Sequence, residues 1–332
     1  MTNTFLAQIA PQRSTQYADL VTTLAPYELL LSPLREHLVD EPQLVDYGRQ
    51  SYLKFELDTT LTDDMRETFD HFAMLDGVFH YYDAIDDIAG PLLKPLDVTS
   101  QTFLPHSLIA TRRYRGKTNE LFTQFMLNIA RDSSAFRTTP WRKLTVLDPL
   151  SGGGTTLFGA IILGADAIGV ERDKKVVDGT IGFIKQYMKE ARFPTKYRED
   201  RFKNVGKRWV VTLDQSVRCV IGRGDTVDVA HFVHGLKRPQ LIVTDLPYGI
   251  QHLADWQAML EKALPAWADV LAEGGCLTLS WNATRFKREQ MIDLVESVSE
   301  FRVRDTAPYN QLAHQVDRVI KQRDVIVAGL EG

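Results

Sequence analysis

The chain has 332 residues, of which 44% are hydrophobic and 25% charged, and these values are typical of a soluble globular protein with one large domain or two. It contains no run of about 18 apolar residues, and its first residues lack a basic segment followed by an apolar one, so we expect neither a membrane span nor a signal peptide. Residues 1–105 carry 6 Lys/Arg against 17 Asp/Glu, a net −11, whereas residues 106–332 carry 33 against 26, a net +7. We therefore predict an acidic N-terminal domain over 1–105 and a mildly basic domain over 106–332 whose charge favours nucleic acid as a partner.

The N-terminal segment is expected to be a small α+β domain. SYLKFEL (51–57) alternates apolar and polar residues and predicts a strand. The segment 61–83 opens with acidic residues and continues with apolar spacing that suits a helix. GPLLKPLD (90–97) holds two prolines and a glycine and predicts a linker.

From residue 118 onward, predicted strands alternate with predicted helices. This alternation indicates parallel βαβ units and a doubly wound, Rossmann-like α/β sheet of seven strands, with an antiparallel strand at its edge. Strands are expected in the segments 143–150, 166–173, 217–225, 239–247, 275–282, 301–306 and 323–330. Helices are expected in the segments 118–131, 155–165, 174–191, 256–274 and 287–298, the first of them capped by Thr118.

Cysteine and histidine usage argues against a metal site. Cys219 and Cys276 lie in apolar, strand-like runs without CxxC spacing, which predicts buried free thiols in a cytoplasmic protein. His231 and His234 are three residues apart, but no third ligand is close in sequence, so we expect them at the surface.

Acidic residues end four of the predicted strands: Asp148, Glu171, Asp225 and Asp245. In open α/β sheets, ligands bind beyond the carboxyl ends of the strands, where these side chains would meet. The loop DPLSGGGTT (148–156) follows the first of the strands and brings glycines and free helix amides to the same edge. It lacks the third glycine of a dinucleotide fingerprint and the lysine of a phosphate loop, so we expect a ligand without a phosphate chain.

The spacing of the acids indicates which ligand this is. Glu171 follows Gly152 by 19 residues and suits the two hydroxyls of a ribose, and Asp225 suits the amine of an adenine. A ribose and an adenine without phosphates describe S-adenosylmethionine. For each acid taken alone, helix capping or a solvated turn is the favoured interpretation, whereas three acids in register with a triple-glycine loop favour cofactor binding.

The stretch DLPYG (245–249) suggests what receives a methyl group. Asp245 and the carbonyl of Leu246 can accept both hydrogens of an exocyclic amine, which turns the nitrogen lone pair toward a methyl donor. Pro247 stiffens the turn, and Tyr248 offers a flat face on which a base can stack.

With these motifs the sequence resembles the amino-methyltransferases, whose motif is [D/N/S]-P-P-[F/Y/W]. Over about 106–330 it is similar to the THUMP-associated tRNA guanine-N2 methyltransferases and related RNA methylases, which have the class I methyltransferase fold; YRGKTNELFTQFMLNIA and HQVDRVIKQRDVIVAG resemble their flanking segments. Leu246 replaces a proline of the bacterial and archaeal members, as in some eukaryotic tRNA guanine-N2 members. Residues 1–105 do not match a THUMP module.

The resemblance implies a set of site residues. The residues expected to hold the target base are Asp245, Leu246, Pro247 and Tyr248. Those expected to bind S-adenosylmethionine are Thr118, Asn119, Asp148, Pro149, Ser151, Gly152, Gly154, Thr155, Thr156, Glu171, Arg172, Gly224, Asp225 and Thr226, with Thr118 and Asn119 near the methionine, Glu171 on the ribose, and Asp225 with Thr226 on the adenine.

Two basic segments that also contain aromatic residues are candidates for contact with the substrate. Residues 110–117 hold four basic residues in eight, and residues 196–209 hold six basic and two acidic residues. The side chains expected to contact nucleic acid are Arg112, Arg113, Arg115, Lys117, Arg198 and Lys203, with His314 and Arg318 as weaker candidates. An ordinary solvated insertion explains either segment equally well.

The leading hypothesis is an RNA methyltransferase that acts on guanine-N2 in tRNA. The alternatives are a DNA adenine-N6 methyltransferase, a methyltransferase of a small molecule or protein, and a binding protein that has lost catalysis.

Overall fold

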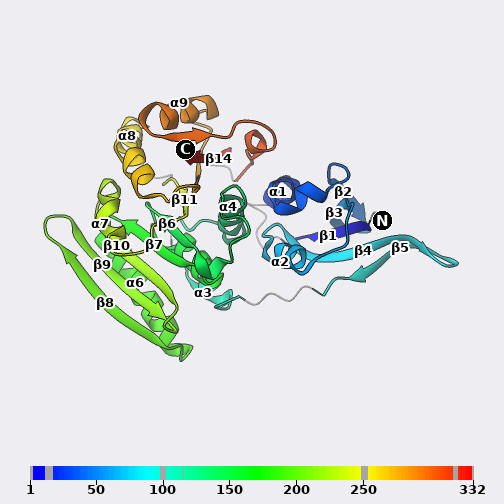
Figure 1. The fold of residues 1–332 in the computed structure, drawn as a ribbon, viewed down its shortest axis with the longest axis horizontal. Helices are drawn as coiled ribbons and strands as arrows, with labels where there is room; N and C mark the ends of the chain where they lie inside the picture. The colour runs from blue at the N-terminus through cyan, green and yellow to red at the C-terminus, as the bar shows by residue number, and fades with distance from the viewer. Residues whose placement is uncertain are drawn as a thin grey trace. The chain divides into compact units, whose positions relative to one another are not determined.

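The computed structural model describes residues 3–11, 18–97, 102–114, 116–247, 253–316 and 321–330. The chain divides into two units, each described by itself below (Figure 1). The N-terminal unit comprises Met1–Gln101 with Thr306–Arg323, and the C-terminal unit comprises Thr102–Asp305 with Asp324–Gly332. No helix among the described residues is long and apolar enough to cross a membrane.

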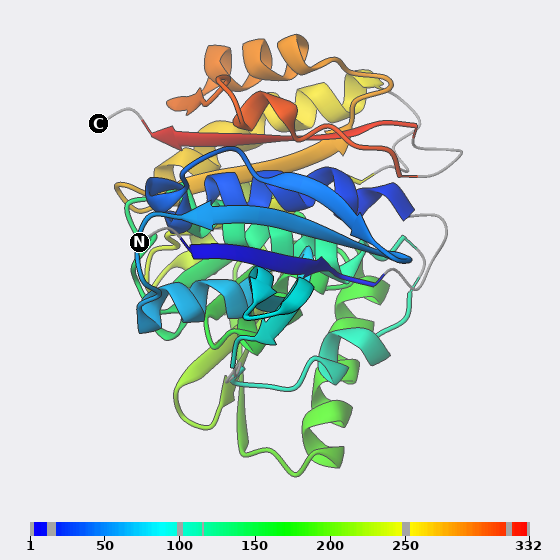
Figure 2. The ribbon, with the colours of Figure 1, turned by 90° about the vertical axis from the view of Figure 1, so that its right-hand side faces the viewer.

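The N-terminal unit is an antiparallel sheet of the order β2-β3-β1-β4-β5, with helices α1 and α2 on one face (Figure 2). Its elements are β1 (Asn3–Ile9), α1 (Ala18–Leu31), the 3-10 helix η2 (Pro33–His37), β2 (Gln43–Tyr47), β3 (Gln50–Leu57), α2 (Asp63–His71), β4 (Leu75–Ile85) and β5 (Ile88–Pro95). A cluster of aromatic rings joins the sheet to α2, in which Phe5 and Phe55 stack at 5.5 Å and Phe69 lies 5.8 Å from Phe55.

Two sequence predictions for this unit are wrong. The helix expected over 61–83 ends at His71, because the chain turns at Phe72. The residues from Leu75 onward form the strand β4 instead. The expected linker 90–97 is mostly β5, because the strand lies at the edge of the sheet, where prolines cost few ladder hydrogen bonds. The predicted strand at 51–57 is confirmed as β3.

The C-terminal unit is built on a nine-stranded sheet of the order β13-β14-β12-β11-β6-β7-β10-β9-β8. Its strands are β6 (Thr145–Asp148), β7 (Asp166–Glu171), β8 (Thr195–Phe202), β9 (Gly206–Leu213), β10 (Val217–Arg223), β11 (Leu241–Asp245), β12 (Cys276–Asn282), β13 (Phe301–Val303) and β14 (Arg323–Leu330). Its helices are α3 (Ser107–Thr111), α4 (Glu120–Asp132), α5 (Thr155–Ile162), α6 (Lys174–Glu190), α7 (Val229–Val233), α8 (Leu253–Val270) and α9 (Arg288–Val298), with the 3-10 helices η3 (Trp141–Lys143) and η4 (Thr226–Asp228). A further 3-10 helix, η5 (Tyr309–Gln311), lies in the 306–323 segment that belongs to the N-terminal unit.

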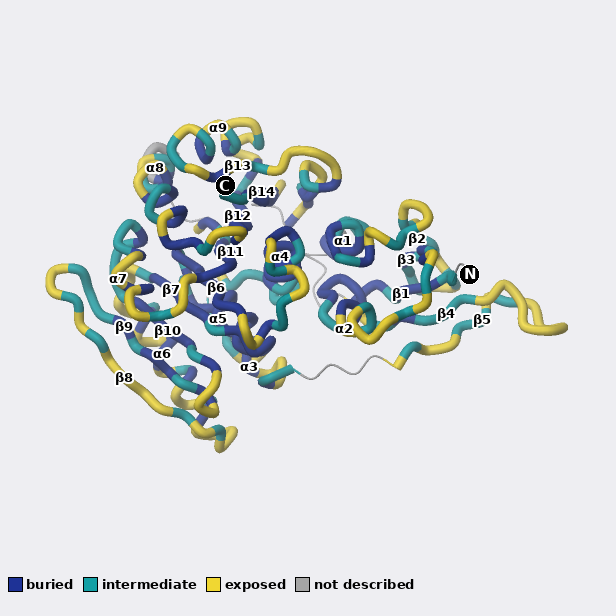
Figure 3. The backbone as a smooth tube through the Cα atoms, in the orientation of Figure 1, coloured by how far each residue is buried: buried dark blue, intermediate teal, exposed yellow. Residues whose placement is uncertain are grey.

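The predicted α/β class is confirmed, and the sheet is larger than expected. Pairing is parallel among β12, β11, β6, β7 and β10, and the predicted antiparallel edge is present in β13 and β14. The segment 196–209, expected between a helix and a strand, forms most of the antiparallel hairpin β8–β9 and extends the seven strands to nine. Helices α4 to α6 lie on one face of the sheet and α7 to α9 on the other, which makes the central strands fully buried (Figures 1 and 3).

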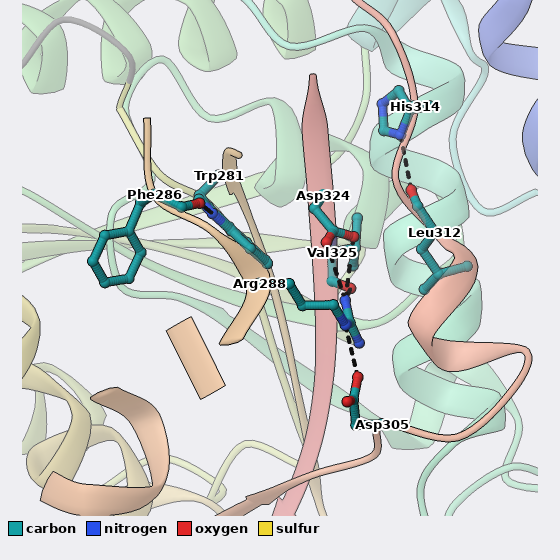
Figure 4. A network of polar contacts seen from close by, with 8 residues as sticks. All are labelled: Trp281, Phe286, Arg288, Asp305, Leu312, His314, Asp324 and Val325. Carbon is teal, nitrogen blue, oxygen red and sulfur yellow. Dashed lines mark hydrogen bonds and ion pairs between the residues drawn. The ribbon is translucent and has the colours of Figure 1, made fainter. Parts of the chain in front are cut away.

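An arginine at the start of α9 joins that helix to β14, the last strand of the chain (Figure 4). At the start of α9, Arg288 donates from Nε to Asp305 (2.7 Å) and from Nη1 to Asp324 and to the Val325 carbonyl (3.2 and 3.0 Å). Asp305 and Asp324 are the residues at which the chain leaves and re-enters the C-terminal unit. Arg288 therefore ties both ends of the 306–323 excursion to one helix.

The two cysteines are buried free thiols, as predicted. Burial raises the pKa of both the Cys219 and the Cys276 thiols to about 12. Because the thiolate is the reactive form, neither side chain is suited to nucleophilic chemistry.

Candidate functional site

The four strand-end acids lie in order along one edge of the C-terminal sheet. Asp245, Asp148 and Glu171 end the adjacent parallel strands β11, β6 and β7, and Asp225 comes shortly after β10, the next strand. Neighbouring strands are about 4.8 Å apart, so the ends of β6, β7 and β10 span roughly 10 Å. The sheet thus brings together the acids that the sequence spreads over nearly a hundred residues.

The glycine loop between β6 and α5 is folded back on the sheet. Gly152 and Gly154 have φ values of +48° and +89°, a left-handed conformation that favours glycine, and Gly154 is the N-cap of α5. The Ser151 amide donates to the Val170 carbonyl of β7 at 2.9 Å. A Cβ at Gly152 would meet nothing within 4 Å, so the described residues leave space beside this glycine for a ligand.

Tyr114 completes the loop, and sequence analysis did not place it in the site. Its ring lies against Gly153, where a Cβ would come within 2.4 Å of the ring, and its hydroxyl is hydrogen-bonded to Thr155 at the start of α5. The only sequence signal was an aromatic residue within a basic segment. Tyr114 covers the Gly153 side of the loop and leaves the Gly152 side to a ligand.

Asp148 is buried at the centre of the site and is held by neighbouring groups. Its Oδ1 accepts hydrogen bonds from Thr244 Oγ1 (2.9 Å) and from the Leu150 amide (3.2 Å), and Thr156 bonds to it from α5. Burial raises the pKa of Asp148 to about 7, a rise that these hydrogen bonds oppose and the charge of Asp245 supports. Thr244 is a second residue that sequence analysis missed, although a threonine in an apolar strand is a visible signal.

We expect Asp148 to make the C-terminal unit less stable as the pH rises from about 4 to 7. Over that range the unfolded chain ionises while folded Asp148 stays protonated, and the penalty is fully present above about pH 7. Asp148→Asn removes the titrating group and keeps an oxygen for Thr244. Between pH 5 and 8 the wild type should lose roughly 2–3 kcal/mol more unfolding free energy than the variant.

Urea titrations followed by tryptophan fluorescence measure this difference, because all five tryptophans belong to the C-terminal unit. Identical pH dependence in the two proteins would show that Asp148 does not titrate near neutral pH.

Asp245 is held by two hydroxyl groups from other elements. Thr118 Oγ1 donates to Asp245 Oδ2 at 2.8 Å, and Ser280 Oγ of the adjacent strand β12 is hydrogen-bonded to Oδ1. The Leu246 amide donates to the Ser280 carbonyl at 2.9 Å, which fixes the peptide that follows the carboxylate. Ser280, like Thr244, is a polar residue in an apolar strand that sequence analysis did not select.

The two described residues that follow Asp245 differ in burial. Leu246 is buried in the core next to α8, whereas Pro247 is exposed at the end of β11. Tyr248 lies outside the described residues, so its predicted stacking role stays a prediction.

Thr118 and Asn119 lie at the start of α4, next to Asp245. Asn119 is the N-cap, since its side chain accepts from the Phe122 amide at 3.1 Å, so the predicted capping role of Thr118 is wrong. The reason is that Thr118 uses its hydroxyl for Asp245 instead.

The acids after β7 and β10 make local hydrogen bonds that leave them at the edge of the sheet. Glu171 accepts from the Asp173 amide (2.6 Å), and Asp225 caps η4 through the Val227 amide (3.2 Å). Beside them Arg172 is exposed, while Thr226 is buried and accepts from Trp267 Nε1 at 3.0 Å. These hydrogen bonds of Glu171 and Asp225 are therefore consistent with a capping role and with ligand binding.

The remaining loop residues are packed rather than open. Pro149, Thr155 and Thr156 are buried with the loop. Gly224 lies against the Phe232 ring, which a Cβ would approach to 2.4 Å, so its need for glycine is explained by packing.

Five of the six predicted substrate-contacting cations lie among the described residues, and they fall into two groups. Arg112 stacks over Phe183 at 5.1 Å, and Lys117 donates to the Ile109 carbonyl at 2.6 Å and pairs with Glu120. Arg113 is exposed, and Arg115 lies outside the described residues. Arg198 and Lys203 are exposed on the β8–β9 hairpin. Of the weaker candidates, His314 is buried and Arg318 lies outside the described residues.

The site residues fit S-adenosylmethionine. The space beside Gly152 and the acids Glu171 and Asp225 occur in the order of three neighbouring strands, which matches a methionine, a ribose and an adenine in turn. Asp245 lies on the opposite side of β6 from the two acids.

Comparison with known proteins finds similarity of fold. TrmN from Thermus thermophilus is 13% identical with a TM-score of 0.46, over 99% of this chain and 100% of that chain. The 16S rRNA N2 methyltransferase RsmC of T. thermophilus, in complex with AdoMet and guanosine, is 14% identical with a TM-score of 0.38, over 87% of this chain and 58% of that one. A TehB-like SAM-dependent methyltransferase from Corynebacterium glutamicum is 15% identical with a TM-score of 0.35, over 57% and 80%.

No protein-family model and no curated protein matches the chain. At TM-scores below 0.5 these similarities support no conclusion about this chain. The strand topology itself confirms the expected fold class: the C-terminal unit is a doubly wound, mostly parallel α/β sheet with an antiparallel edge, and the N-terminal unit is a separate antiparallel α+β sheet.

Proposed function

We propose that the protein transfers a methyl group from S-adenosylmethionine to an exocyclic amine of a nucleobase, and that its substrate is guanine-N2 in tRNA. The observation that carries the proposal is Asp245. It ends the strand next to the glycine loop, and hydroxyl groups of Thr118 and Ser280 bind both of its oxygens. A carboxylate fixed in this way is a preorganised acceptor for an amine hydrogen.

Asp245 and the Leu246 carbonyl orient the amine. Each accepts one of its two hydrogens, and the nitrogen lone pair then points toward the side of β6 where the glycine loop lies. Thr118 and Ser280 each donate to one Asp245 oxygen, and each oxygen of a carboxylate has two acceptor lone pairs.

S-adenosylmethionine supplies an electrophilic methyl group on a sulfonium when it is bound. Transfer of this methyl group to the amine would leave a neutral thioether and would require the nitrogen to release one proton. Asp245 is the acceptor in line for this proton, which it passes to water.

The remaining site residues are proposed as cofactor contacts. Glu171 would bind the ribose hydroxyls, Asp225 with Thr226 the adenine, and Gly152 with Ser151 the methionine. Asp148, with a pKa of about 7, would hold the loop through Leu150 and Thr156.

The test is a methyl-transfer assay with labelled S-adenosylmethionine and, separately, unmodified tRNA or unmethylated DNA, followed by digestion to nucleosides and mass analysis. N2-methylguanosine from tRNA is the expected product. Label in DNA alone would replace the proposed substrate with an adenine in DNA. Absence of label in both, with cofactor binding verified by calorimetry, would overturn the nucleic-acid substrate and point to a small molecule or protein.

A further inference from the structure

The β8–β9 hairpin is the part of the C-terminal unit that the proposed chemistry does not use. From Thr195 to Leu213 the hairpin carries six basic and two acidic residues. The other basic segment, 110–117, uses Arg112 and Lys117 for contacts within the protein. Among the described residues the hairpin therefore groups more exposed cations, namely Arg198, Arg201 and Lys203, than the segment 110–117, where Arg113 is exposed.

The strand pairing shows which end of the hairpin faces the site. β10 runs parallel to β7, and its last residue, Arg223, pairs with Glu171 on one side and Lys207 of β9 on the other. The turn between Phe202 and Gly206 thus lies at the carboxyl edge of the sheet, the edge that carries the strand-end acids. The opposite end of the hairpin, with Lys196, lies at the amino edge.

Cations outnumber acids at the turn. Arg201 and Lys207 share one carboxylate, Glu199, at 3.0 and 3.5 Å. Lys203 is exposed, and no carboxylate among the described residues lies within ion-pair distance of it. Three cations against one acid leave a net charge of about +2, and the 83% exposed Arg201 side chain makes its surface ion pair a weak one. Figure 3 shows this hairpin as largely exposed along β8.

Lys207 also places a cation next to an aromatic ring at the turn. Its ammonium lies 4.3 Å from the centroid of the Trp209 ring, so an indole and a cation are presented together. This pairing of charge and flat ring suits a polynucleotide, which offers phosphates and stacking bases. Residues 1–105, by contrast, sum to −11.

The turn is distant from the proposed methyl acceptor. Four to five strand spacings separate β11 from β9 and β8, which is about 19–24 Å at 4.8 Å per strand. A ligand that reaches both places must be a polymer of several nucleotides. A free nucleoside or a trinucleotide occupies only the end near Asp245.

The geometry points to the hairpin turn Arg201–Lys207 as a phosphate-binding surface for RNA, about 20 Å along the sheet edge from the target base. This inference rests on the proposed function for the identity of the ligand. It adds that substrate length, not only base identity, determines affinity, and that Lys203 and Arg201 contact the RNA backbone.

The experiment compares two double variants with the same change in charge. Arg201→Ala with Lys203→Ala removes two cations at the turn. Lys189→Ala with Lys196→Ala removes two exposed cations at the amino-edge end of the same region and serves as the matched control. Binding of unmodified tRNA is followed by fluorescence anisotropy from 50 to 200 mM salt, and methyl transfer is measured on tRNA and on a guanosine-containing trinucleotide.

For the turn variant we expect about tenfold weaker tRNA binding and a salt slope reduced by about 1.5, because two phosphate contacts are lost. The control variant should bind tRNA within about twofold of the wild type, and transfer to the trinucleotide should be equal in all three proteins.

Equal weakening in both double variants would overturn the inference, because the effect would then be general charge. Unchanged binding in the turn variant, or a parallel loss on the trinucleotide, would overturn it as well. If tRNA binding depends on the turn but no RNA is methylated, the inference stands and the proposed function fails.

Discussion

Replacing Asp245 with asparagine is expected to lower the turnover of methyl transfer by about 10²–10³-fold, while cofactor affinity stays within about twofold. The carboxylate accepts an amine hydrogen and then the released proton, and asparagine does neither equally well. The protein should still fold, because the asparagine side chain keeps an oxygen for either Thr118 or Ser280. Single-turnover assays with tRNA measure the rate, and calorimetry with S-adenosylmethionine measures the affinity.

The matched control is Asp269→Asn, which removes an exposed carboxylate of α8 in the same unit. It should leave both the rate and the cofactor affinity unchanged. Full turnover in the Asp245 variant would remove the carboxylate from the mechanism.

Removing either hydroxyl group that is hydrogen-bonded to Asp245 is expected to slow methyl transfer. Ser280→Ala and Thr118→Val each remove one hydroxyl donor to Asp245, and each should reduce turnover by roughly tenfold. Ser280→Ala should do so with little change in cofactor affinity. The single-turnover rate at saturating tRNA distinguishes positioning from simple destabilisation, because a less stable protein that is still folded keeps its rate. An unchanged rate in both variants would show that neither hydroxyl group positions Asp245.

The sequence was sufficient to locate seven strands of the C-terminal sheet because most of them are apolar runs that end at a polar residue. VLD, GVE and VTD could be recognised as strand ends without knowledge of their neighbours. The β8–β9 hairpin was missed because its residues are mostly charged. Its strands are held by ladder hydrogen bonds and cross-strand ion pairs such as Arg208–Asp200 at 2.9 Å, which a hydrophobic pattern does not reveal.

For the site, the sequence indicated the acids and the glycine loop but not the groups that hold them. Thr118 lies 127 residues before Asp245, and no local pattern relates the two. Lys117 was proposed as a substrate contact on charge alone, and the fold supplies it with Glu120 and the Ile109 carbonyl. Residue type therefore predicts what chemistry a side chain can perform, whereas its partner depends on tertiary packing.

In the N-terminal unit, replacing Glu28 with alanine is expected to cost about 3–5 kcal/mol of local stability. Glu28 is 1% exposed on α1, and its carboxylate accepts from the Ala73 amide at 2.9 Å and the Met74 amide at 2.8 Å. These amides begin the segment that leads from α2 into β4, so the carboxylate fixes the point at which the predicted helix ends. Without it, two buried donors lose their acceptor.

Hydrogen exchange measured by mass spectrometry on peptides that span Ala73 and Met74 tests this expectation, with exchange faster by roughly 10²–10³-fold in the variant. Glu28→Gln keeps one acceptor oxygen and should be intermediate, and Glu41→Ala, an exposed carboxylate of the same unit, should match the wild type. The urea transition followed by tryptophan fluorescence should not move, because all five tryptophans belong to the C-terminal unit. A shift of that transition would show that the two units unfold together, whereas unchanged exchange at Ala73 would show that the carboxylate contributes little to the turn.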